Sequence, residues 1–159
     1  MGHIQKIILI ILTVPFASFP GGLIAYVLLY EAPRFEYSML IPIGMTFFGI
    51  CSFYFHLKAK SFYRLYKAQL PMPKVEPIFW FICISFGMSF VVVSSFLHYT
   101  LANVANPSDN YVVLIFSIPM FVFGVWTVVE AFYLYKLVKE NQTKTRISEI
   151  DEIKGQIKE

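Results

Sequence analysis

The sequence predicts an all-α integral membrane protein whose four spans form a helix bundle. Two observations carry this prediction: four long apolar stretches, and a low content of charged residues. Of the 159 residues, 57% are hydrophobic and 14% are charged, whereas a soluble domain has about 45–50% apolar and about 25% charged residues. The apolar stretches cover residues 7–30, 38–57, 78–101 and 111–135. Each stretch reaches the roughly 20 residues that a helix needs to cross the hydrocarbon core.

The domain organisation follows from these spans. The first stretch begins after Lys6 like a signal peptide, but it continues to about Tyr30 without a small-residue cleavage site. We therefore interpret it as an uncleaved anchor that is also the first span. Residues 1–135 form one transmembrane domain, and residues 136–159 form a polar tail too short for a separate soluble domain.

The basic residues predict the orientation. Lys6, five basic residues between the second and third spans, and six in the tail make twelve of the thirteen basic residues on one face. Lysine and arginine favour the cytoplasmic side, so both termini are expected inside. We expect a multi-pass protein of a bacterial inner membrane. The lipid bilayer is its first partner, and its basic residues lie beside membrane ends rather than on a nucleic-acid-binding surface.

Small residues recur at helical spacing in every span, which predicts close contacts between helices. The predicted packing positions are Ala17, Gly21, Ala25, Gly49, Gly87 and Gly124. A second interpretation is that these faces line a polar pathway, although no charged side chain lies on them near the middle of the membrane. Pro15 and Pro20 also suggest a kink in the first span, and a helix broken at residues 19–22 could act as a hinge or a binding site.

A weak internal repeat links the two halves of the chain. Residues 43–52 (IGMTFFGICS) and 118–127 (IPMFVFGVWT) share the pattern Ile-x-Met-x-x-Phe-Gly-aliphatic-x-hydroxyl. This pattern suggests two duplicated helical hairpins that run in the same direction.

One polar pair is expected within the spans. Glu130 is the acidic residue well inside an apolar stretch, and His56 ends the second stretch at a similar depth. A carboxylate there is costly unless it is paired, protonated or hydrated. A His56–Glu130 pair would satisfy both groups and could respond to pH. The other interpretations are a structural hydrogen bond, or a Glu130 side chain that reaches cytoplasmic water. The spacing of the cysteines and histidines predicts no metal site, and no cofactor is expected.

The connector before the third span is basic and rich in tyrosine, which suits anionic lipid headgroups. The predicted headgroup contacts are Lys58, Lys60, Arg64 and Lys67. Residues 64–69 (RLYKAQ), followed by Glu76, resemble the Arg-x-x-Arg-Ala-Gln-x-Asn-x-x-Glu loop of the membrane-associated glutathione transferase and eicosanoid-enzyme family. Pro71 and Lys74 replace the Asn and Glu of that loop, and here the loop precedes the third span rather than the second. The resemblance therefore transfers no glutathione site.

The tail carries isoleucines at spacings of three, three and four residues. These are Ile147, Ile150, Ile153 and Ile157. After a polar joint at residues 141–145, they predict a short amphipathic helix on the cytoplasmic side. Such a helix is marginal alone in water, so it is expected to pack on another copy, another protein subunit or the membrane surface.

These features favour a non-enzymatic membrane subunit or scaffold that oligomerises or binds a partner. The first alternative is a small oligomeric pore or channel that acts as a membrane effector. A weaker alternative is a membrane-embedded enzyme with a lipid substrate that uses Glu130, His56 or the Arg64 connector.

Overall fold

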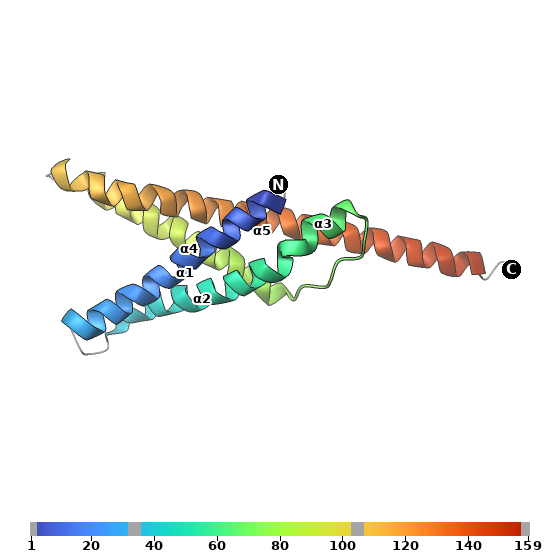
Figure 1. The fold of residues 1–159 in the computed structure, drawn as a ribbon, viewed down its shortest axis with the longest axis horizontal. Coiled ribbons are helices and arrows are strands. Elements are labelled where there is room, and N and C mark those ends of the chain that lie inside the picture. Colours follow the sequence, from blue (N-terminus) through green and yellow to red (C-terminus); the bar gives the residue numbers. More distant parts are fainter. Residues whose placement is uncertain (1–2, 32–35, 103–106, 157–159) are drawn as a thin grey trace.

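The computed structural model describes residues 3–31, 36–102 and 107–156, and these residues form helices joined by short connectors. The elements are α1 (His3–Tyr26), the π-helix η1 (Val27–Glu31), the 3₁₀-helix η2 (Tyr37–Met39), α2 (Leu40–Lys58), the 3₁₀-helix η3 (Ala59–Ser61), α3 (Phe62–Lys67), α4 (Pro77–Ala102) and α5 (Pro107–Gln156) (Figure 1).

Within the described residues, four helical segments are long and apolar enough to span a membrane, which confirms the number of spans predicted from the sequence. They cover His3–Tyr30, Tyr37–Lys67, Pro77–Leu101 and Val113–Ile147. The second and fourth are longer than predicted at their C-terminal ends, because the helices continue into polar sequence where no proline interrupts them. The outward faces of the third and fourth segments carry large apolar side chains such as Phe81, Phe96 and Phe116, as expected for a surface that faces lipid.

The helices pair as two hairpins. α1 packs on α2, α4 packs on α5, and contacts between α2 and α4 join the two hairpins. Figure 1 shows the hairpins converging at the end that carries the N-terminus and α3, and diverging toward the other end. We call the converging end, with η3, α3 and residues 68–76, the polar end. The middle of the bundle is filled by a cluster that includes Leu9, Phe86, Phe90 and Phe123.

α1 runs without a break through Pro15 and Pro20. The break that the sequence suggested at residues 19–22 therefore does not occur. Proline is tolerated in a membrane helix where neighbouring groups and local adjustments accommodate the missing donor. The helix changes character only at Val27–Glu31, where it widens into a π-helix.

α5 also differs from the sequence-based expectation. It continues as one helix of 50 residues through the predicted joint, so the tail is an extension of the fourth span rather than a separate short helix. The polar residues of the joint have other roles. The backbone N–H of Met72 donates to Asn141 Oδ1 at 2.9 Å, and Asn141 Nδ2 donates to the Leu70 carbonyl at 3.1 Å. Thr143 bonds back to the carbonyl of its own helix at Lys139.

Candidate functional site

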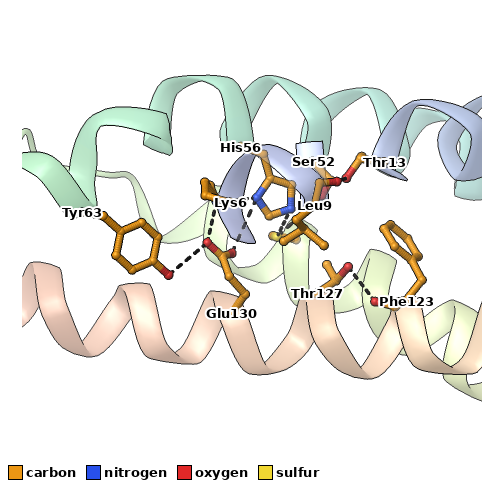
Figure 2. Close-up of polar contacts among 10 residues, drawn as sticks. Lys6, Leu9, Thr13, Ser52, His56, Tyr63, Phe123, Thr127 and Glu130 are labelled. Atoms are coloured by element: carbon orange, nitrogen blue, oxygen red, sulfur yellow. Dashed lines mark hydrogen bonds and ion pairs between the residues drawn. The ribbon is translucent and has the colours of Figure 1, made fainter. Parts of the chain in front are cut away.

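Three charged or titratable side chains meet at the polar end, one each from α1, α2 and α5. Lys6 Nζ lies 2.7 Å from Glu130 Oε1 and 2.7 Å from His56 Nδ1. All three side chains are at most 2% exposed. The Tyr63 hydroxyl, from α3, donates to Glu130 Oε1 at 3.4 Å. Figure 2 shows these groups pointing toward one another between the helices. We call Lys6, His56 and Glu130 the buried triad.

The roles of the two histidine ring nitrogens are assigned from the charge of Lys6. A lysine ammonium group can only donate, so His56 Nδ1 accepts and the ring proton sits on Nε2. Nε2 faces Cys83 Sγ at 3.5 Å, and the Ser52 hydroxyl donates to the same sulfur at 3.5 Å. His56 is therefore neutral in this arrangement, and its 3.6 Å approach to Glu130 Oε2 is a contact between two acceptors. Within the described part of the chain, Glu130 Oε2 has no hydrogen-bond partner.

The predicted pairing of His56 with Glu130 is modified by Lys6. The two residues lie side by side, but the ammonium group of Lys6 bridges them. Glu130 is 1% exposed, so its carboxylate does not reach water as one interpretation proposed. The sequence alone assigns Lys6 only a role in orientation. The missed signal was its spacing, because Lys6 lies on the same helical face as Leu9, Thr13 and Ala17, all of which are buried.

The buried triad is suited to holding helices together. Lysine and glutamate taken out of water each carry a large desolvation penalty, which is offset only while the two stay paired. The pair connects α1 to α5 across 124 positions of sequence. Because all three side chains are buried, they bind one another rather than water. Over the described residues, His, Cys, Asp and Glu side chains form no group of three or more suited to hold a metal ion.

The predicted packing glycines fall at close helix crossings. A Cβ atom built on Gly124 would lie 2.6 Å from the Gly87 carbonyl oxygen, and one on Gly49 would lie 2.7 Å from the Ala17 Cβ. Gly21 is looser, with Thr46 at 3.2 Å. Ala25, predicted on the same face, is exposed.

The predicted headgroup and tail residues have distinct surroundings. Lys58 Nζ lies 4.7 Å from the centre of the Tyr54 ring, and Lys60 is exposed. Arg64 and Lys67 line a cavity at the polar end. On α5, Ile147 and Ile150 are exposed. Two predicted contacts of the tail lie beyond what can be described: Ile153 lies in α5 but its side chain is outside the described set, and Ile157 lies outside the described residues.

Comparison of the chain with protein-family models, with curated proteins and with solved structures gives no significant match.

Proposed function

We propose that this chain is a non-enzymatic membrane subunit that binds a protein partner, a second copy of itself, through the extension of α5. The observation that carries the proposal is that α5 continues as one helix from the fourth span to Gln156. Figure 1 shows this extension projecting past the rest of the molecule. Ile147 and Ile150 on it are 54% and 44% exposed. An apolar face outside the bundle is stabilised when another helix covers it.

The interior of the bundle favours a scaffold over a channel made by one copy. The rings of Phe86, Phe90 and Phe123 fill the middle, each at most 2% exposed. They contact one another edge to face, with centroids 5.1 to 6.0 Å apart. Ion conduction through one chain would need to displace these rings, so the pore alternative requires several copies.

The buried triad favours a structural role over catalysis. A catalytic acid or base must reach the substrate proton within hydrogen-bond distance. Lys6, His56 and Glu130 instead bind one another and are almost completely enclosed. This supports the non-enzymatic proposal over an enzyme that acts on lipids.

A second copy is the partner that the geometry suits best. Copies in one membrane share their orientation, so their α5 extensions run parallel and present Ile147 and Ile150 at the same height. Isoleucines three or four residues apart are the side chains that parallel helix pairs bury. The basic residues at the polar end favour the cytoplasmic side for this contact.

Native mass spectrometry of the full chain in lipid nanodiscs tests the proposal. We expect a dimer that the pair Ile147→Ser/Ile150→Ser weakens at least tenfold. The matched control, Val122→Ser/Val125→Ser, alters two exposed apolar residues of α5 within the bundle and should leave the dimer intact. A monomer at all concentrations, or equal weakening by both pairs, would refute self-association through the extension. In a separate assay, ion flux into lipid vesicles that contain the full chain is expected to stay at background, and conduction would favour the pore.

A further inference from the structure

A second site lies beside the buried triad, and it does not depend on the proposed self-association. A cavity of about 480 Å³ opens at the polar end between three elements. Its wall residues are His3 of α1, Tyr63, Arg64, Tyr66 and Lys67 of α3, and Tyr133 and Leu137 of α5. We propose that this cavity binds the phosphate group of an anionic phospholipid.

The charge of the cavity matches an anion. Arg64 and Lys67 lie three residues apart on α3, on neighbouring positions of one helical face. Among the described residues, neither side chain forms an ion pair. The planar guanidinium group of arginine presents two parallel N–H donors to a phosphate, and lysine adds a second positive charge. The described lining contains no carboxylate.

The aromatic walls of the cavity are held in place. The rings of Tyr63 and Tyr133 stack with centroids 6.2 Å apart and planes 20° apart. The Tyr63 hydroxyl is bound to Glu130, and the Tyr66 hydroxyl donates to Glu140 at 3.1 Å. Glu140 thus lies near the site but is occupied by Tyr66. Because the walls are fixed by these contacts, a bound group meets a site that is already formed.

The location favours a lipid over a soluble phosphate compound. The cavity lies beside the ends of the apolar stretches 38–57 and 111–135, where the sequence predicts the membrane interface that tyrosine rings and phospholipid headgroups share. Of the four basic residues predicted to contact headgroups, two line the cavity and two do not. Arg64 and Lys67 line it, whereas Lys58 and Lys60 do not, since Lys58 lies over the Tyr54 ring. General attraction to an anionic surface would use all four residues alike.

The test counts lipids bound to the full chain by native mass spectrometry after release from nanodiscs of phosphatidylglycerol and phosphatidylcholine. We expect retained phosphatidylglycerol, which Arg64→Gln/Lys67→Gln lowers about tenfold. The control Lys58→Gln/Lys60→Gln removes the same charge from the same connector and should change retention by less than twofold. Arg64→Lys keeps the charge but loses the two parallel N–H donors of the guanidinium group, so it should give an intermediate loss of retained phosphatidylglycerol. Equal losses in both pairs, or equal retention of phosphatidylcholine, would overturn the proposal.

A competition arm separates the two sources of phosphate. Millimolar inorganic phosphate and glycerol 1-phosphate are added to the wild-type protein with bound phosphatidylglycerol. We expect no displacement, because the acyl chains hold the lipid at the bundle surface. Displacement by inorganic phosphate would assign the cavity to a soluble anion and overturn the lipid assignment. Matching thermal unfolding of the variants, measured in parallel, confirms that they remain folded.

Discussion

The two hairpins are closed in the same way at their middle but differ at the polar end. Gly49 packs on Ala17 within the first hairpin, and Gly124 packs on Gly87 within the second. Gly49 and Gly124 hold the same position of the repeated segments 43–52 and 118–127. Toward the polar end the repeat stops. Seven residues on, the first hairpin has His56 where the second has Ala131.

That difference separates the contacts that form each hairpin from the contacts between the two hairpins. The first hairpin contributes Lys6 and His56 to the buried triad, and the second contributes Glu130. Two identical hairpins would bring like charges together, which is destabilising in a medium of low dielectric constant. Unlike hairpins place opposite charges in contact. Small residues therefore close each hairpin, and charge complementarity selects how the hairpins meet.

The largest expected effect comes from removing the cation of the buried triad. Lys6→Met leaves the Glu130 carboxylate buried without its partner, and breaking such a pair costs about 3–5 kcal/mol. Thermal unfolding in detergent should show a large drop in melting temperature. The control, Lys60→Met, removes an exposed lysine of η3 at the polar end and should have little effect. A Lys6→Met variant as stable as the control would contradict the role of the Lys6–Glu130 pair in stabilising the junction of the hairpins.

The next effect tests whether the hairpins close alike. Gly49→Ala and Gly124→Ala each place a Cβ within 2.7 Å of a neighbouring helix, and such overpacking costs about 1–3 kcal/mol. Gly22→Ala and Gly44→Ala have nothing within 4 Å, so they should gain up to about 1 kcal/mol from helix propensity. The unfolding midpoints of the four variants measure these changes in stability. If alanine is tolerated at Gly49 but not at Gly124, the equivalence of the two crossings is lost.

A similar effect is expected where α5 holds residues 70–72. Asn141→Ala removes two hydrogen bonds and leaves the Met72 N–H buried without an acceptor, a loss of about 1–3 kcal/mol. Asn141→Asp keeps the acceptor and should retain part of the stability. Hydrogen exchange of residues 70–76 should rise more in the alanine variant than in the aspartate variant. Unchanged exchange in both would mean that other contacts hold this segment.

The smallest effect is a gain at the end of α3. Gln69 has φ of 55°, in the left-handed region, where the Leu70 N–H bonds back to the Leu65 carbonyl. Glycine adopts this conformation without the steric cost of a Cβ, so Gln69→Gly should stabilise the chain by about 0.5–1 kcal/mol. The neighbouring control Ala68→Gly should give no gain. A lower melting temperature for Gln69→Gly would show that its side chain matters more than its backbone.

The number of spans could be predicted from the sequence because apolar length is a local property of each stretch. His56 and Glu130 were predicted as a pair for the same reason, since each is an unusual polar residue in an apolar stretch. Lys6 was not assigned to the site, because a lysine before a span also has an ordinary role in orientation. Its contact with Glu130 depends on how two hairpins meet, which no single span encodes.

The α5 extension and its contacts could be predicted only in part. The isoleucine spacing indicated a helix, but the polar residues 141–145 suggested a joint. Asn141 favours loops when its amide must find local partners. Here the amide bonds to residues 70 and 72, about seventy positions earlier in the chain. That partner lies on a segment whose position is set by tertiary structure, so the residues around Asn141 do not indicate it.

A double-mutant cycle between Lys6 and Glu130 tests the central claim, that opposite charges stabilise the junction of the two hairpins. The cycle compares thermal unfolding of the wild type, Lys6→Met, Glu130→Gln and the double variant in one detergent. We predict a coupling of about 2 kcal/mol or more, within the range for residues in direct contact, with the double variant more stable than Lys6→Met alone. Additive losses, with no recovery in the double variant, would contradict the claim.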